Sequence, residues 1–324
     1  MRLHRRAAVL AIVAAFAPAG FAQPGFPDKD KPIKIVVPFA AGGGVDAAAR
    51  LLGTQLQKRL GVNVIVENKA GASGTIGGQA VRTAPADGHT LLFSAATHVL
   101  AKQVLSAPPY DPQTDFAPVA RTGSAPLLLV VAPSKQQAKL GDLLASIRQQ
   151  PEKWTAGIPA AGAPSHLATL LMAKQAQVKL TYVPYKGTQP ALMDVAGGHT
   201  DLLLDSAISL TQMAKTGKVR PIAISSAQRS VLAPDVPTFK ESGLPNFAYE
   251  SWYGVWAPKD TPADRVAALN AAINAATAAL AKSGALAGLG IEPVTETAAQ
   301  FKAFIAADVK EGAELLKDAG FKPD

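Results

Sequence analysis

Short apolar runs alternate along the chain with longer segments in which apolar residues recur every three or four positions. The short runs are rich in β-branched residues and end at turn signals, so they predict strands. The longer segments predict amphipathic helices. The expected strands are 33–37, 63–67, 90–94, 127–131, 154–157, 181–184, 201–204, 220–225, 254–257 and 292–294; the expected helices are 45–60, 75–83, 141–150, 165–174, 189–196, 206–216, 262–282 and 298–319. Such alternation predicts an α/β fold of mainly parallel sheets flanked by helices.

Local signals mark the ends of several predicted helices. Thr261 before Pro262 predicts a cap followed by proline in the first helical position. Thr297 with Gln300 fits a capping box, and Gly320 predicts the end of the last helix. Asp46 predicts the cap of the first helix. These signals support the predicted helix ends.

The stretch 34–50, KIVVPFAAGGGVDAAAR, is the most informative part of the chain. A strand stops at Pro38, and three consecutive glycines then lead into a helix. The first N–H groups of a helix have no partner within it, and the helix dipole favours negative charge there. The stretch therefore predicts a backbone-lined site for a small anion, and a tight turn without a ligand is the alternative. It lacks the features of a Walker loop and of a dinucleotide fingerprint.

Other strand ends repeat this character. In open α/β sheets, ligands bind beyond the carboxyl ends of the strands. The segments that follow six of the predicted strands are small, glycine-bearing or polar: 39–43, 68–75, 95–98, 158–166, 185–188 and 205–206. Ordinary turns do not account for six such segments together, so we expect them to line one binding cleft.

The first 22 residues have the features of a secretory signal. Three arginines, Arg2, Arg5 and Arg6, precede an apolar stretch at 7–17, and small residues stand before a cut after Ala22. The alternative is a permanently inserted anchor. The cut site has no cysteine, which argues against a lipoprotein, and no later segment reaches the roughly 18 apolar residues of a membrane span. We expect an exported, soluble mature chain.

Composition excludes several classes of protein. The chain has no cysteine, which removes disulfides, thiol nucleophiles and thiolate ligands. Its formal charge is +8, and the three arginines of the signal account for three of these charges, which leaves +5. Basic residues are dispersed and aromatic residues make up only 6%, so we expect no nucleic-acid partner. About 300 mature residues are enough for two lobes.

Catalytic and metal motifs are missing. No G-x-S-x-G elbow occurs, and the five histidines do not form an H-E-x-x-H pair. Adjacent Ser165 and His166 at a helix start would point in different directions, which disfavours a triad. We therefore expect no enzyme, no metal and no cofactor.

Eight segments together resemble the Bug family, the periplasmic receptors of tripartite tricarboxylate transporters. They are PIKIVVPFAAGGGVDAAAR (32–50), VENKAGASGTIGG (66–78), APADGHTLLFS (84–94), GAPSHLA (162–168), VPYKGTQPAL (183–192), GGHTDLLLD (197–205), PDVPTFKESGLP (234–245) and SWYGVWAPKDTP (251–262). The resemblance covers essentially the whole mature chain. It implies a two-lobed type II binding protein, of the Venus flytrap kind. It also implies small carboxylate ligands, such as dicarboxylates, amino acids or aromatic acids, held largely by main-chain N–H groups and water.

The resemblance also implies a division of the chain and a set of site residues. We expect 23–123 and 252–324 to form the first lobe and 124–251 the second, with crossings near 117–127 and 249–257. Ser165 is expected to be both a helix cap and a ligand donor. The residues expected to bind the ligand are Phe39, Ala41, Gly42, Gly43, Gly74, Thr75, Ser94 and Ala96 in the first lobe, and Ser165, His166, Tyr185, Gly187 and Asp205 in the second. The chain departs from the common family pattern at Gly44 and His98.

Several polar candidates have two interpretations. Asp205 would suit a ligand ammonium group, or it accepts hydrogen bonds from the backbone of the next helix. Lys186 could pair with a carboxylate or point to solvent. Trp252, Tyr253 and Trp256 fall near the return crossing, where large apolar groups more often fill a core than stack on a ligand.

The function expected from the resemblance is capture of a small carboxylate and its delivery to transporter subunits in the membrane, by a monomer. Presentation of the ligand to a membrane sensor kinase is the alternative, because both functions use the same closed lobes. A secreted hydrolase is the weaker alternative.

Overall fold

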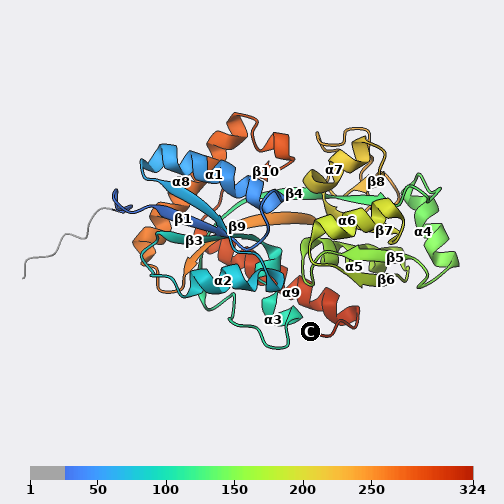
Figure 1. Cartoon of the computed structure of the whole chain (residues 1–324), viewed down its shortest axis with the longest axis horizontal. Coiled ribbons are helices and arrows are strands. Elements are labelled where there is room, and N and C mark those ends of the chain that lie inside the picture. Colours follow the sequence, from blue (N-terminus) through green and yellow to red (C-terminus); the bar gives the residue numbers. More distant parts are fainter. Residues whose placement is uncertain (1–25, 324) are drawn as a thin grey trace, which may run out of the picture.

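The computed structural model describes residues 26–323 (Figure 1). The predicted signal peptide and its cut site lie outside these residues. The described strands are β1 (Ile33–Val37), β2 (Val64–Asn68), β3 (Thr90–Ala95), β4 (Phe116–Val131), β5 (Thr155–Ile158), β6 (Thr181–Pro184), β7 (Leu202–Ser206), β8 (Arg220–Ile224), β9 (Glu250–Pro258) and β10 (Glu292–Pro293). The helices are α1 (Gly44–Leu60), α2 (Thr75–Arg82), α3 (Ala101–Val104), α4 (Leu140–Gln149), α5 (Pro164–Ala176), α6 (Thr188–Gly197), α7 (Ala207–Lys215), α8 (Ala263–Lys282) and α9 (Ala298–Asp318), with short turns η1 (Ala72–Gly74), η2 (Ala96–His98) and η3 (Ala287–Leu289).

The strands build two lobes that share β4. The order across the sheet is β2-β1-β3-β9-β4-β7-β5-β6, and β10 and β8 also pair with β4. In the first lobe, β4 pairs with β9 from Phe116 to Pro126. In the second lobe, β4 pairs with β7 and β8 from Leu127 to Val131. Figure 1 shows the two lobes side by side, with β4 and β9 running along the middle.

Parallel pairing is confined to the outer strands of each lobe. β1 pairs in parallel with β2 and β3, and β5 pairs in parallel with β6 and β7. The pairings of β9 with β3 and β4 and of β4 with β7 are antiparallel. The predicted parallel order therefore holds at the strand ends that carry the glycine loops, and the whole sheet is mixed.

The strand β4 is much longer than the pattern at 127–131 predicts. Its first part contains Pro118, Gly123 and Pro126, which normally argue against a strand interior. The register with β9 shifts between Pro118 and Ala120 and again between Arg121 and Gly123. These irregularities accommodate residues that a regular ladder would reject. One continuous strand therefore crosses between the lobes.

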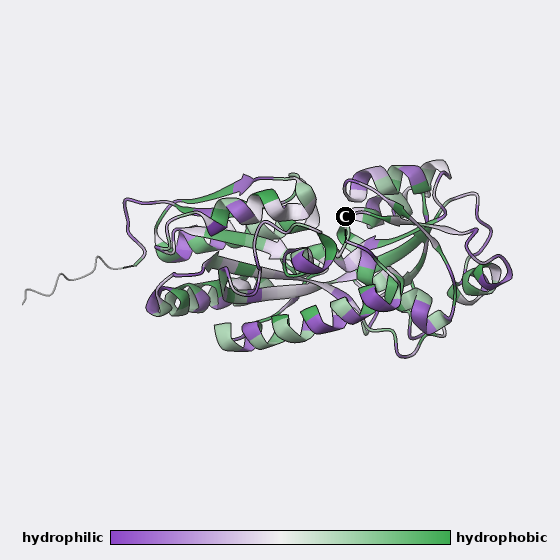
Figure 2. Cartoon of the chain, turned by 90° about the horizontal axis from the view of Figure 1, so that it is seen from below, coloured by the Kyte–Doolittle hydropathy of each residue, from purple (hydrophilic) through white to green (hydrophobic). Residues whose placement is uncertain are grey.

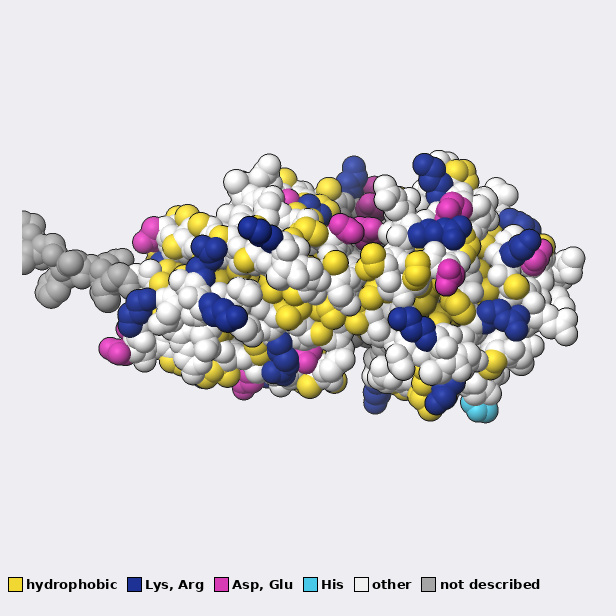
Figure 3. All heavy atoms as spheres, turned by 90° about the horizontal axis from the view of Figure 1, so that it is seen from above, with side chains coloured by type: hydrophobic (Ala, Val, Ile, Leu, Met, Phe, Trp, Pro, Cys, Tyr) yellow, Lys and Arg dark blue, Asp and Glu magenta, His cyan; other side chains and the backbone are white. Residues whose placement is uncertain are grey.

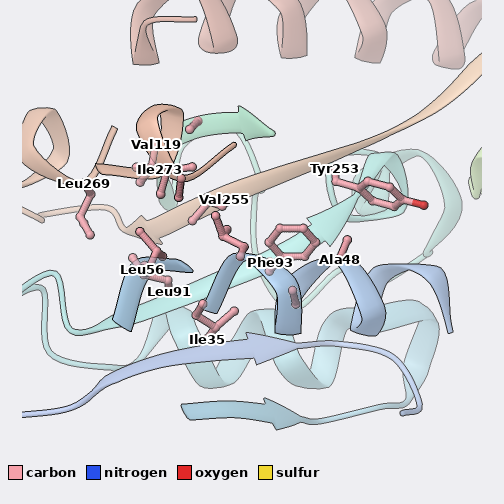
Figure 4. Close-up of a cluster of buried hydrophobic side chains, with 14 of the residues drawn as sticks. Ile35, Ala48, Leu56, Leu91, Phe93, Val119, Tyr253, Val255, Leu269 and Ile273 are labelled. Carbon is pink, nitrogen blue, oxygen red and sulfur yellow. The ribbon is translucent and has the colours of Figure 1, made fainter. Parts of the chain in front are cut away.

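The first lobe packs its core on one face of the sheet. Figure 4 shows Ile35, Phe93 and Val255 from three strands against Leu56 of α1 and Ile273 of α8. A second cluster on the opposite face combines the sheet with α9, and separate clusters fill the second lobe. In Figure 2, the strands are green or pale, and purple residues lie mainly on the helices and loops. This distribution explains how a chain without disulfides builds a stable interior.

The interior also contains the three large aromatic side chains at the return crossing. Trp252, Tyr253 and Trp256 are all buried, which confirms their predicted role in the core. His98 is buried too, and its ring packs edge-on against Phe116 and Trp256.

Helix ends confirm some predictions and correct others. Thr297 and Gln300 form the capping box, and Gly320 turns the chain with φ +67°. Pro262, rather than Thr261, stands at the cap of α8. Gly43 stands at the cap of α1, so the prediction that Asp46 is the cap was wrong. Ser165 is likewise inside its helix, because Ala163 holds the cap position of α5.

No helix within residues 26–323 combines the length and the apolar character that a membrane span requires.

Candidate functional site

The two lobes contact each other where their parallel strands end. A Cβ placed on Gly44, at the start of α1, would lie 3.2 Å from the Tyr253 hydroxyl oxygen and 3.4 Å from Ser206 Oγ, which belongs to the second lobe. A Cβ placed on Gly162 of the second lobe would lie 2.8 Å from Val104 in the first. Figure 3 shows a notch between the lobes at one edge of the molecule. The glycine loop before α1 and the end of β7, both predicted to line the cleft, are thus brought close together.

The start of α1 leaves backbone donors without partners. Within residues 26–323, no hydrogen bond is found for the N–H groups of Gly43, Gly44 and Val45, and the first helical bond runs from Ala47 N to Gly43 O. No side chain caps this helix. Gly43 has a φ of −81°, and a Cβ placed on it would have only Ala40 O, at 3.8 Å, within 4 Å. These N–H groups and the helix dipole form a site that favours an anion.

A polar network holds the glycine loop in place. Asp46 accepts hydrogen bonds from Gly42 N at 2.9 Å, from Asn68 Nδ2 at 2.9 Å and from Arg50 Nε at 3.0 Å. Burial by itself raises the pKa of Asp46, but the bonds from Arg50, Gly42 and Asn68 outweigh it and lower the pKa. Asn68 also donates to Phe39 O at 3.1 Å. The N–H of Gly42, a predicted ligand donor, is therefore engaged within the loop.

Of the other residues predicted in this loop, Phe39 is half-buried and packs against the core of the first lobe. Ala41 is exposed at the tip of the loop.

The second glycine loop has an unusual backbone. Ala72, Ser73 and Gly74 have φ values of 44°, 52° and 90°, and the first two are not glycine. Consecutive left-handed residues cost energy and are found preferentially at functional sites. Gly74 N itself donates to Gly71 O, and Thr75 Oγ1 donates to Ala72 O at 2.7 Å. The two predicted ligand residues thus stabilise the turn.

The third strand end is buried behind these loops. Ser94 has no exposed surface, and its hydroxyl has no hydrogen-bond partner among the described residues. Ala96 is also fully buried. The ring of His98 faces Tyr110, Phe116 and Trp256, and burial lowers its pKa to about 3, so it is a neutral core residue.

In the second lobe, α5 presents the counterpart of α1. The first helical bond of α5 runs from Leu167 N to Ala163 O, and no bond is found among residues 26–323 for the N–H groups of Ser165 and His166. His166 Nδ1 accepts a hydrogen bond from Gly162 N at 3.2 Å. Burial lowers the pKa of His166 to about 4, so the imidazole is neutral. Ser165 is 1% exposed, in accord with a position at the wall between the lobes.

Three other predicted residues of the second lobe are engaged within it. The Tyr185 hydroxyl donates to Asp194 Oδ2 at 2.8 Å. Gly187 N donates to Pro159 O at 2.8 Å, and Gly187 has a φ of +110°. Asp205 accepts from Thr188 Oγ1 at 2.6 Å, and its burial raises its pKa. Hydrogen bonds from Thr188 and the Ser206 backbone match the structural interpretation of Asp205 better than the ammonium one.

Tyr253 is a core residue whose hydroxyl reaches the start of α1, a contact that the sequence did not predict. Its ring stacks on Phe93 in the first lobe, and Figure 4 shows its hydroxyl pointing away from that cluster. Burial and the nearby Asp205 charge raise the pKa of Tyr253 to about 12, so the phenol keeps its proton. The sequence signal for this contact was a tyrosine at the return crossing, because a buried tyrosine hydroxyl usually faces a polar partner.

Charged side chains do not form a continuous surface on the face in Figure 3, where Lys and Arg are spread singly over both lobes. Among residues 26–323, no group of three His, Asp or Glu is placed to hold a metal ion.

The match to known proteins covers nearly the whole chain. Residues 48–321 match the family described as "Tripartite tricarboxylate transporter family receptor". The chain belongs to this receptor family. It is 36% identical over 319 residues to Protein BugT of Bordetella pertussis, a match that covers 97% of this chain and 98% of that protein. The expected Bug resemblance is thereby confirmed.

Solved structures of the family share the fold. The periplasmic binding protein BugD is 34% identical with a TM-score of 0.80, over 91% of this chain and 99% of BugD. A Rhodopseudomonas palustris protein solved with adipate is 32% identical with a TM-score of 0.84, over 91% and 99%. MatC of the same organism, solved with malate, is 31% identical with a TM-score of 0.78, over 88% and 99%. The receptor has the two-lobed binding-protein fold, and its family consists of solute-binding proteins rather than enzymes.

Proposed function

We propose that this receptor captures one small carboxylate between its two lobes in the periplasm and delivers it to tripartite tricarboxylate-type transporter subunits in the membrane. The single observation that carries the proposal is the pair of helix starts without capping side chains, α1 in one lobe and α5 in the other, at the edge where the lobes meet. Ligands of related receptors, adipate and malate, are acids of this kind.

The proposed ligand site uses backbone more than charge. N–H groups of Gly43, Gly44 and Val45 would bind a carboxylate oxygen from the first lobe, and those of Ser165 and His166 would bind from the second. Ser94 would add its hydroxyl, which has no hydrogen-bond partner in the described part of the chain. A buried donor that gains an anionic partner contributes more than a neutral hydrogen bond.

Closure of the lobes is the proposed signal to the transporter. β4 and β9 form the crossings, so rotation about them would bring the two walls together. A ligand that contacts both walls favours the closed form by its difference in affinity for the two forms. The proposed lobes are 23–123 with 252–324, and 124–251. Export with cleavage after Ala22 and a monomeric state complete the proposal.

Calorimetry on the purified mature chain tests this function. A panel of mono- and dicarboxylates that includes adipate and malate is titrated, with the corresponding diamides as controls. We expect at least one acid to bind with 1:1 stoichiometry, to be recovered unchanged, and to raise the melting temperature, while its diamide does not bind. Absence of saturable binding by every acid, or chemical conversion of one, would contradict the proposal.

Delivery is tested separately in vesicles that contain the transporter subunits. Uptake of the bound acid should depend on added receptor.

A further inference from the structure

Helix α9 joins the two lobes on the side away from α1. Near its start, Phe301 packs against Trp252 and Trp256, with ring centroids 5.8 and 5.3 Å apart. At its end, Asp318 Oδ2 accepts a hydrogen bond from Lys174 Nζ of α5 at 2.6 Å. Figure 1 shows α9 passing from beneath the first lobe towards the second. The helix is thus a third link between the lobes, besides β4 and β9.

The middle of α9 lies in a tight contact between both lobes. A Cβ placed on Gly312 would be 3.0 Å from Leu100 of the first lobe and 3.2 Å from Leu167 of α5. Leu100 also faces Gly162, where a Cβ would lie 3.3 Å from it. Close packing of this kind transmits small displacements, because the neighbours cannot shift independently.

The turn at the end of α9 fixes the position of the Phe321 side chain. Phe321 N donates to Leu316 O at 2.9 Å, and Gly320 N donates to Lys317 O at 3.0 Å. With Gly320 at φ +67°, these bonds form a Schellman turn, in which the residue after the glycine makes an apolar contact. The turn therefore fixes where the ring of Phe321 lies.

That ring lies against the start of α5. The centroids of Phe321 and His166 are 5.4 Å apart, with an angle of 63° between the rings. On another side, His166 faces Tyr182 at 6.3 Å. The same imidazole accepts the N–H of Gly162, so Phe321 contacts a side chain that links the loop before α5 to the first turn of the helix.

We propose that Phe321 is a positioning residue for ligand binding: it holds His166 in the orientation that fixes Gly162 and the first turn of α5. This inference rests on the proposed function, because it concerns the second wall of the same site. Removal of the ring would free the imidazole to rotate and release Gly162 N. The N–H groups of Ser165 and His166 would then lose their fixed direction, and the bound acid would lose donors from one lobe.

The test combines a readout that needs no ligand with one that does. In Phe321→Ala, NMR titration of the His166 imidazole is expected to show a pKa that rises from about 4 towards its ordinary value of 6.5, because the ring becomes solvated. Affinity for malate and adipate, measured by calorimetry on the full mature chain, is expected to fall at least threefold.

Three further variants separate positioning from general stability. Phe321→Leu keeps an apolar side chain and should restore most of the affinity. Gly320→Val keeps the ring but strains the turn at φ +67°, so it should act like Phe321→Ala. Lys174→Ala removes an exposed ion pair between the same two helices and should leave affinity within a factor of two.

An unchanged His166 titration in Phe321→Ala overturns the inference, whatever the binding result. So does a raised pKa of His166 with unchanged affinity, because Phe321 would then only shield the ring. If no acid binds the unaltered chain, the proposed function fails, and the inference fails with it as a statement about binding. A raised His166 pKa in Phe321→Ala would still show that Phe321 fixes the imidazole.

Discussion

Helices α1 and α9 begin in opposite ways. At α9, Thr297 Oγ1 accepts the N–H of Gln300 at 3.2 Å, and Gln300 Oε1 accepts the N–H of Thr297 at 2.9 Å. At α1, the cap is Gly43, which has no side chain to accept anything. The acid in its first turn, Asp46, accepts the N–H of Gly42 outside the helix instead. The capping box satisfies two donors at the start of α9, while the first donors of α1 have no partner among the described residues.

The difference shows what each helix contributes. A capping box stabilises a helix by about 1 kcal/mol, so α9 gains stability from its ends. In α1, the first backbone N–H groups have no capping side chain, and they lie at the contact between the lobes, where Gly44 faces Tyr253 and Ser206. Substitutions that change each start should therefore affect different properties: ligand affinity at α1 and α5, and stability at α9.

The largest expected effect is at the cap of α1. Gly43→Val is expected to weaken carboxylate binding by at least 100-fold, or about 2.7 kcal/mol, because the side chain occupies the space in front of the free N–H groups. The backbone at φ −81° accepts valine, and only Ala40 O, at 3.8 Å, lies near the added Cβ. Calorimetry measures the affinity, and circular dichroism checks that the variant folds.

Gly141→Val is the matched control for this variant. Gly141 lies in the first turn of α4, also with open space around it. The carboxylate affinity of Gly141→Val should equal that of the unaltered chain. Equal losses in both variants would mean that the effect of Gly43→Val does not come from the site.

The second effect concerns stability and pH on α9. Asp308 accepts a hydrogen bond from Trp252 Nε1 at 3.2 Å, and its other oxygen has no partner among the described residues. Burial raises the pKa of Asp308 from 3.8 to about 6, a shift increased by Glu311 and opposed by Trp252 and Arg121. Since the folded pKa lies above the unfolded one, the protonated acid stabilises the fold below about pH 4, and this stabilisation is lost as the pH rises through 6.

Asp308→Asn cannot ionise, so it should be more stable than the unaltered chain at pH 8, by on the order of 2 kcal/mol, and nearly equal to it at pH 4. Urea unfolding at both pH values measures the difference. Asp318→Asn is the control: its exposed carboxylate pairs with Lys174, which lowers its pKa, so no gain at pH 8 is expected. A gain from Asp308→Asn that is the same at both pH values would exclude ionisation as the cause.

The third effect tests α5 as the counterpart of α1. Ser165→Ala removes the Ser165 hydroxyl, which we expect to donate to the ligand beside the backbone N–H groups, and should cost roughly 1–2 kcal/mol of binding free energy, a typical loss for a buried donor. Ser146→Ala on α4, whose hydroxyl bonds to Asp142 O at 2.9 Å, should leave affinity unchanged. Unchanged affinity in Ser165→Ala would show that the Ser165 hydroxyl takes no part in binding, because the variant keeps the backbone N–H.

The smallest effect is at the start of α9. Thr297→Ala is expected to lower the free energy of unfolding by about 1 kcal/mol and to leave ligand affinity unaltered. Thr297→Ser keeps the hydroxyl and should retain most of the stability. A loss of affinity in the alanine variant would contradict the conclusion that the start of α9 affects stability and not ligand binding.

The sequence predicts those features that depend on local pattern. The capping box at Thr297, the turn at Gly320 and the glycine loop before α1 were all foreseen, because each is specified by neighbouring residues. The length of β4 was not, because its first part contains Pro118, Gly123 and Pro126, and its pairing with β9 shifts register next to Pro118 and Gly123.

Which amides are free depends on partners that lie far apart in the sequence. Gly187 looked like a ligand donor, but its N–H bonds to Pro159 O. The Tyr185 hydroxyl also has a partner, Asp194, although this one lies only nine residues away. The contact of Phe321 with His166 joins the end of the chain to its middle, and no local pattern specifies it.

The most direct measurement of the central claim is a titration of the ¹⁵N-labelled chain with malate and adipate, followed by amide NMR. The account predicts that the N–H signals of Gly43, Gly44, Val45, Ser165 and His166 move together, with one dissociation constant, while that of Gln300 stays in place. Saturable binding that leaves the α1 and α5 amides unmoved would contradict it.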